Sequence, residues 1–135
     1  MSKSIKNKRH AAYVAQSCRC FYCTAPMWES GPDQFALKYG ITLRQARLLC
    51  CTAEHLTPRS EGRSNAAENI AAACLHCNRT RHRAHKPLAS HAYLRLVRSR
   101  VREAAGCRTG WRGWSGDADL RPAEQGDKTV TFNCR

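Results

Sequence analysis

Two Cys-x-x-Cys pairs constrain the fold of this chain more than any other feature. The first is Cys20 and Cys23, and the second is Cys74 and Cys77. Two such turns present four thiolates, the donor set that tetrahedral zinc binds in closed structural sites. The pairs are far apart in the sequence, so they must meet in space if they share one zinc ion. Disulfides and an iron–sulfur cluster are the alternatives, and Cys18 competes with Cys20 as a ligand.

A structural metal would suit a chain of this size and cysteine content. The chain has 135 residues, enough for one domain with a modest core, and structural zinc contributes roughly 10 kcal/mol or more to folding. Its nine cysteines are an odd number, which fits a fully oxidised framework poorly. Neither a secretory signal nor a transmembrane stretch can be recognised. We therefore expect a reducing, cytoplasmic setting of a prokaryotic or phage-like kind.

The charge of the chain indicates a polyanionic partner. There are 23 Lys and Arg against 10 Asp and Glu, a formal net charge of +13. The basic residues are clustered in "KSIKNKR", "RTRHRAHK" and "RLVRSRVR", whereas a merely solvated surface would spread them. A membrane is not favoured, because no strongly amphipathic basic helix carries Trp or Phe on its apolar face. Nucleic acid is the expected partner.

The pattern of helix and strand signals divides the chain into short elements. Residues 1–17 form a basic arm with little to bury, which we expect to be flexible. "GPDQ" begins a helix that Gly40 ends, and Thr42 caps a second helix through "LRQARLL". "LLCCTAEH" predicts a strand, and "NIAAAC" its returning partner although alanine favours helix. Two helices follow, "CNRTRHRAH" and about 88–105, and then a Gly- and Trp-rich tail at 107–135 without clear period.

Polar residues around the second cysteine pair predict a second centre. A zinc ion held by four cysteines has no open position, so it cannot activate water. Glu54 and His55 end the first predicted strand, while Asn78 and His82 are four residues apart on the predicted helix and share one face. Oxygen donors of this kind favour Mg²⁺ or Mn²⁺. We therefore expect an open cation site beside the closed zinc site.

These motifs resemble those of the HNH endonuclease family. The match consists of "EHLTP", then "EN", then "CLHCN" with His82 following, and it covers about residues 47–86. The flanking cysteine pairs are those of the zinc-bearing branch of the family. The resemblance implies an α+β, mainly helical domain over 18–106, built around a ββα-metal (His-Me finger) core with a four-cysteine structural zinc site.

The resemblance also implies a role for each residue of the second centre. His55 falls on the general base, and Asn69 on the asparagine that ties the loop backbone together and orients the histidine. Asn78 takes the third signature position, often histidine, which makes this chain an HNN variant. Glu54 replaces the usual aspartate as a metal ligand, and His82 matches a histidine that binds metal or phosphate in some members.

The implied activity is metal-dependent hydrolysis of phosphodiester bonds in DNA, most naturally double-stranded. One divalent cation, Mg²⁺ or Mn²⁺ or another ion, would be held by Glu54 and Asn78, and the products would carry 5′-phosphate ends. Basic residues near the motif are expected to contact phosphates: Arg59, Arg63, Arg79, Arg81, Arg83 and Lys86. Two alternatives stay open, a non-catalytic zinc module that binds nucleic acid by charge and an RNA-cleaving nuclease. A homodimer or a protein partner is equally compatible with the sequence.

Overall fold

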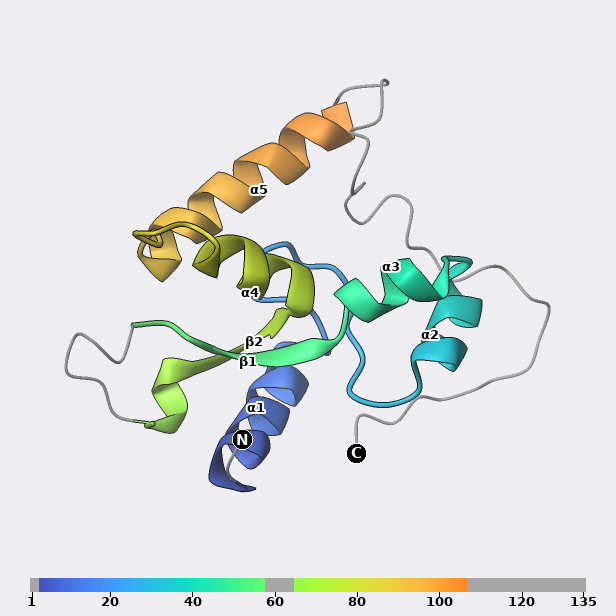
Figure 1. Cartoon of the computed structure of the whole chain (residues 1–135), viewed down its shortest axis with the longest axis horizontal. Coiled ribbons are helices and arrows are strands. Elements are labelled where there is room, and N and C mark those ends of the chain that lie inside the picture. The colour runs from blue at the N-terminus through green and yellow to red at the C-terminus, as the bar shows by residue number, and fades with distance from the viewer. Residues whose placement is uncertain (1–2, 58–64, 107–135) are drawn as a thin grey trace.

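A computed structural model describes residues 3–57 and 65–106 of the chain as a small α+β fold (Figure 1). The expected order of two strands followed by a helix lies at its centre. The elements are α1 (Lys3–Ala15), α2 (Pro32–Tyr39), α3 (Leu43–Leu48), β1 (Cys51–His55), the 3-10 turn η2 (Ala67–Asn69), β2 (Ile70–Cys74), α4 (Leu75–His82) and α5 (Ser90–Gly106). The tail predicted at 107–135 lies outside the described residues.

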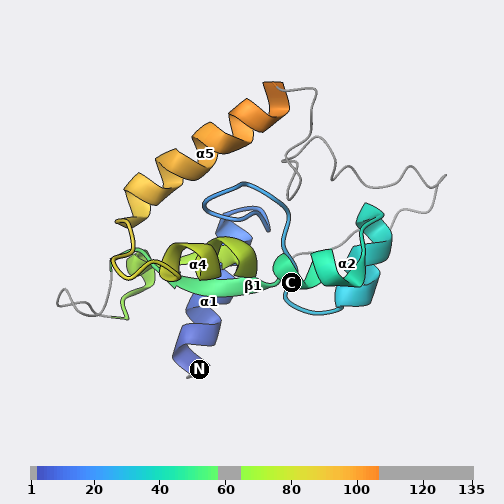
Figure 2. The same cartoon turned by 45° about the horizontal axis from the view of Figure 1, so that its top comes forward.

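An antiparallel hairpin forms the centre of the fold. Strands β1 and β2 pair in a register that sets Cys51 opposite Cys74 and His55 opposite Ile70. Helix α4 lies on one side of the hairpin and α1 on the other (Figures 1 and 2). Every residue of β2 is buried as a result. The alanines of this strand are small enough for two helices to approach it closely, which explains why the strand forms despite their helix propensity.

Helix α1 replaces the flexible arm expected over residues 1–17. The hydroxyl of Tyr13 donates to the carbonyl of Met27 at 3.0 Å. The side chain of Gln16, which follows the helix, makes two hydrogen bonds with the backbone of Ala72, at 2.8 and 3.0 Å. These bonds provide partners for the backbone carbonyl and amide of Ala72 on β2. The composition of the basic segment gives no indication of such contacts.

The two short helices begin and end where the sequence predicts. Gly40 follows α2 with a φ of 62°, a left-handed conformation that glycine adopts at low cost. Thr42 and Gln45 form a reciprocal capping box at the start of α3: the Gln45 amide donates to Thr42 Oγ1 at 3.2 Å, and the Thr42 amide donates to Gln45 Oε1 at 2.9 Å. Both predictions of helix ends are therefore confirmed.

The core contains the four paired cysteines and a small set of larger side chains. Tyr22 and Leu49 are fully buried, and the ring of Tyr22 meets that of Tyr93 edge-on, with centroids 4.9 Å apart. Through Tyr93 and its apolar neighbours, α5 packs above α4 and then extends away from the body (Figure 2). Within residues 3–57 and 65–106, no helix combines the length and apolar character that crossing a bilayer requires.

Candidate metal centre and active site

The four cysteines of the Cys-x-x-Cys pairs meet in one buried cluster. The sulfur atoms of Cys20, Cys23, Cys74 and Cys77 all lie within 4.8 Å of one another, and those of Cys23 and Cys74 are 3.9 Å apart. Zinc–sulfur bonds of about 2.3 Å in a tetrahedron separate the sulfurs by about 3.8 Å, so the cluster fits one such ion. Cys20, and not Cys18, belongs to this group.

Backbone hydrogen bonds couple the cysteine cluster to the start of α4. The amide of Cys74 donates to the sulfur of Cys20 at 3.3 Å, and the amide of Cys77 donates to that of Cys74 at 3.4 Å. Cys74 thereby caps the helix. Hydrogen bonds from the neighbouring thiols, Cys23 foremost, hold the pKa of Cys20 well below its usual range. The cluster therefore favours a thiolate and fixes the first turn of α4.

A buried carboxylate on β1, that of Glu54, meets the last turn of α4. Glu54 is only 1% exposed, and its Oε1 accepts a hydrogen bond from the hydroxyl of Tyr22 at 3.0 Å. His82 Nε2 lies 3.3 Å from both carboxylate oxygens. Burial, followed by the charge of Glu54, raises the pKa of Tyr22, so the phenol stays protonated as a donor. Glu54 and His82 are thus two predicted ligands that the fold brings together.

Arg81 forms a buried ion pair with Glu54, which sequence reasoning missed. Its side chain is 2% exposed, its Nη1 pairs with Glu54 Oε1, and its Nε donates to the carbonyl of Leu88 at 2.9 Å. The side chain predicted to contact phosphate from the surface is therefore directed inward. Its position in the sequence indicates this orientation. Arg81 follows the buried Cys77 by four residues, so the two side chains lie on the same inward face of α4.

His55 ends β1 and points to the opposite face of the strand from Glu54. Its Nε2 lies 3.1 Å from Oδ1 of Asn65, and its backbone carbonyl accepts a hydrogen bond from Arg81 Nη1 at 3.3 Å. The contact with Asn65 was not predicted. The stretch "SNAAEN" contains two asparagines, Asn65 and Asn69, and the family motif points to Asn69 alone.

Asn69 closes the base of the loop that follows β1. Its backbone carbonyl accepts from the amide of Leu56 at 3.0 Å, and its Oδ1 accepts from the amide of Thr57 at 3.3 Å. The two bonds join the chain leaving β1 to the chain entering β2. Asn69 thus ties the backbone around His55, while the imidazole itself meets Asn65.

Asn78 attaches α4 to β1. Its Nδ2 donates to Thr52 Oγ1 at 3.0 Å and to the carbonyl of Ala53 at 3.2 Å. Both of these hydrogen bonds are to β1 residues other than Glu54. The amide nitrogen is therefore used for packing, and only the amide oxygen is left as a donor for a cation.

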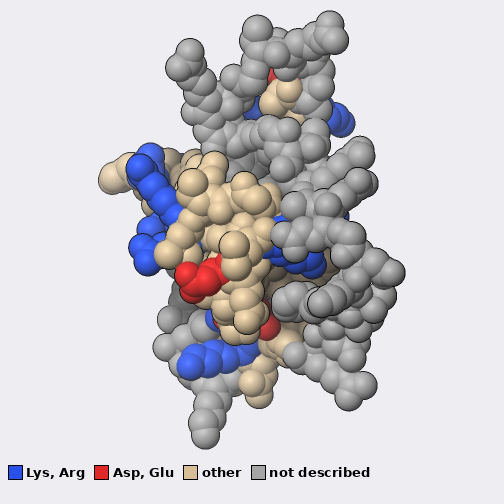
Figure 3. Space-filling view, turned by 90° about the vertical axis from the view of Figure 1, so that its right-hand side faces the viewer, with Lys and Arg blue, Asp and Glu red and all other residues tan. Residues whose placement is uncertain are grey.

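The remaining predicted contacts are surface residues or lie outside the description. Arg79, Arg83 and Lys86 are exposed, whereas Arg59 and Arg63 fall in the undescribed stretch 58–64. On the side of the molecule where α2 and α3 lie, basic side chains form separate patches with acidic ones between them (Figure 3). The described residues on this side therefore mix both signs of charge.

Comparison with known proteins agrees with the geometry of the hairpin and α4. The family model described as HNH endonuclease matches residues 40–84, which contain β1, β2 and α4. No curated protein and no solved structure matches the chain. This match suggests an endonuclease acting on nucleic acid. Residues 40–84 of the chain are therefore similar to the HNH endonuclease domain.

Proposed function

We propose that the protein is a metal-dependent endonuclease that hydrolyses phosphodiester bonds of double-stranded DNA, with His55 as the general base. One observation carries the proposal: at the end of β1, an imidazole held by Asn65 directly follows a buried carboxylate that meets a second histidine, His82. The strand, loop and helix that hold these groups are the segment matched by the family model.

The contact with Asn65 suggests how His55 would act. With Oδ1 of Asn65 as the acceptor, the neutral imidazole carries its proton on Nε2. Its Nδ1 then has the lone pair that takes a proton from water. A positioned general base of this kind typically accelerates a reaction by about 10²- to 10⁴-fold.

The residues beside His55 fit a divalent cation. Glu54 and His82 converge with their donor atoms 3.3 Å apart, and the amide oxygen of Asn78 is a proposed third donor. This mixture of oxygen and nitrogen donors suits Mg²⁺ or Mn²⁺, whereas the cysteine cluster suits zinc. A bound cation would supply positive charge for the negative charge that develops on phosphate oxygens. Arg81 already offsets the charge of Glu54, so we propose that cation binding is modest in strength.

Asn65 provides a test of how His55 is held. We expect Asn65→Ala to lower the cleavage rate by roughly tenfold or more, because the imidazole loses the group that fixes its tautomer and orientation. Zinc content and melting temperature should stay near those of the wild type. Cleavage of supercoiled plasmid under single-turnover conditions is the measurement. Asn65→Asp, which keeps an acceptor oxygen, should retain more activity than Asn65→Ala, and equal loss in both variants would contradict this role.

The substrate class is tested by parallel digestion. The zinc-loaded chain is incubated with supercoiled plasmid, linear duplex DNA and structured RNA, each with Mg²⁺ and with Mn²⁺. The proposal predicts that both DNA substrates are cut and that RNA is cut far more slowly. Preferential cutting of RNA would instead identify a ribonuclease of the same fold. Intact substrates under every condition would favour a binding module without catalysis.

A further inference from the structure

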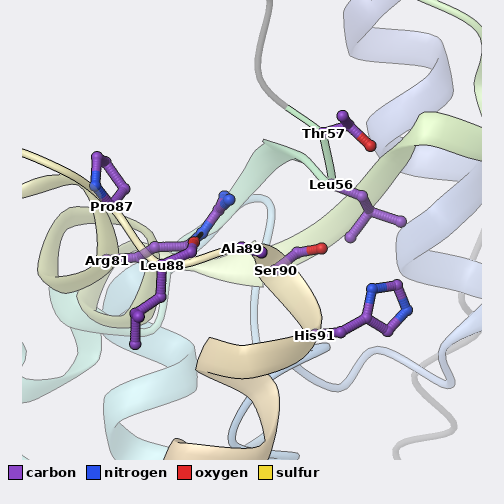
Figure 4. A pocket seen from close by; sticks show the side chains of 8 residues that line it. All are labelled: Leu56, Thr57, Arg81, Pro87, Leu88, Ala89, Ser90 and His91. Carbon is purple, nitrogen blue, oxygen red and sulfur yellow. Dashed lines mark hydrogen bonds between the residues drawn. The ribbon is translucent and has the colours of Figure 1, made fainter. Parts of the chain in front are cut away.

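A cavity adjoins the candidate active site on the side of α5. It has a volume of about 170 Å³ and lies between the end of β1, α4 and the start of α5 (Figure 4). The residues that matter for its chemistry are Thr57, Arg81, Ala89, Ser90 and His91. Arg81 extends from α4 in among the other lining residues (Figure 4). One guanidinium thus separates this cavity from the carboxylate of Glu54.

The guanidinium of Arg81 has one nitrogen left over. Nη1 pairs with Glu54 and Nε donates to Leu88, but the buried Nη2 has no hydrogen-bond partner among the described residues. Burying a donor of a charged group without an acceptor is unfavourable, because the group loses its hydrogen bonds to water. An oxyanion in the adjoining cavity would supply the missing acceptor, and arginine binds such groups strongly.

The start of α5 contributes donors on the same side. The carbonyl of Ala89 accepts the first hydrogen bond of the helix, from the amide of Tyr93 at 2.9 Å, which makes Ala89 the residue at the N-cap position. Alanine has no side-chain acceptor, so it cannot satisfy the first amides of this 17-residue helix. Those amides and the positive end of the helix dipole favour an anion.

A row of basic side chains leads away from the cavity along α5. His91, Arg95, Arg98 and Arg102 are all exposed. Their spacing of four, three and four residues places them within a narrow sector of the helix surface, because each residue turns the helix by about 100°. Successive members are about 4.5–6 Å apart along the axis. A chain of phosphates matches this row better than a single free anion does.

We propose that the cavity between Arg81 and the start of α5 binds a backbone phosphate of the nucleic acid, adjacent to the phosphate that is cleaved. This subsite rests on the proposed function, because it takes a neighbouring group of the same substrate. Arg81 Nη2, the first amides of α5 and the His91 side chain are its donors. Arg81 thereby connects the two sites, with Nη1 toward Glu54 and the remaining nitrogen available to the substrate.

Ala89 allows a test that leaves the catalytic groups untouched. In Ala89→Asp, a carboxylate caps α5 and offers Arg81 an internal anion, so it would occupy the subsite. In Ala89→Asn, a side chain of the same shape caps the helix without the charge. Both variants should raise the melting temperature. Only Ala89→Asp should weaken binding to nucleic acid, which a purely structural role of this region does not predict.

The variants are compared in a His55→Ala background, so that binding is measured without cleavage. We expect Ala89→Asp to bind a short duplex oligonucleotide about tenfold more weakly than Ala89→Asn. The slope of log affinity against log salt should fall by about 0.9, the value for one lost phosphate contact. Equal affinities and slopes for the two variants would overturn the proposal.

Titration with inorganic phosphate separates a backbone phosphate from a free ion. If phosphate shifts the amide resonances of Ser90 and His91 in Ala89→Asn but not in Ala89→Asp, while duplex affinities are equal, the cavity takes a free anion and the proposal is wrong. These readouts do not depend on catalysis. A wild-type chain that fails to cut plasmid, yet shows the expected difference in binding, would contradict the nuclease function and leave the subsite standing.

Discussion

Replacing Cys77 by serine is expected to remove both the zinc and the folded core. Cys77 supplies one of the four clustered sulfurs, and its amide is part of the cap of α4. Structural zinc contributes roughly 10 kcal/mol or more to folding, whereas the whole stability of a domain is about 5–15 kcal/mol. The loss of one ligand is therefore comparable with the entire free energy of unfolding.

The measurement is zinc content together with thermal unfolding followed by circular dichroism. Cys50→Ser is the matched control, because Cys50 is half-buried and lies outside the cluster of four sulfurs. We expect the control to keep its zinc and a cooperative transition. If Cys77→Ser melts at the same temperature as the control and still holds zinc, the cluster is not the support that holds α4.

His55→Ala is expected to have the largest effect on activity. The variant removes the proposed base, so plasmid cleavage should fall by about 10²- to 10⁴-fold. The imidazole is half-buried and its side-chain partner is Asn65, so its loss should cost the fold little. Zinc content, melting temperature and affinity for duplex DNA should remain near those of the wild type.

His85→Ala is the control for this variant, since His85 is exposed and is assigned no role. Both proteins are assayed on supercoiled plasmid at the same zinc content and the same Mg²⁺ concentration. The control should cleave at the wild-type rate. Equal cleavage by the two variants would show that His55 is not the base, whatever the family motif implies.

The frame of the domain could be predicted from the sequence because local signals and the cysteine spacing agree. The end of α2 at Gly40 and the start of α3 at Thr42 depend on local backbone chemistry, and both predictions are confirmed. The alanine-rich strand needed the motif to overrule propensity. Its burial between α1 and α4 is a tertiary effect that no local window contains.

The details of the site could not be predicted because they depend on partners distant in the sequence. Arg81 lies in a run of basic residues that resembles a solvated surface, but in the fold it pairs with Glu54 and donates to the carbonyl of Leu88. Helix α1 forms on the hairpin through Gln16 and Ala72, a pairing of residues 56 positions apart. Asn65 meets His55 beside the loop base that Asn69 closes, and both contacts join the end of β1 to the segment before β2.

The central claim is that one stretch of chain carries two separate centres, a closed cysteine site that supports the fold and an open site for catalysis. The most direct test follows plasmid cleavage by the wild-type chain as Mg²⁺ or Mn²⁺ is added, with zinc content measured at each point. We expect one zinc per chain throughout and cleavage that rises only with the added cation. Cleavage that needs no added cation and instead follows the zinc content would contradict it.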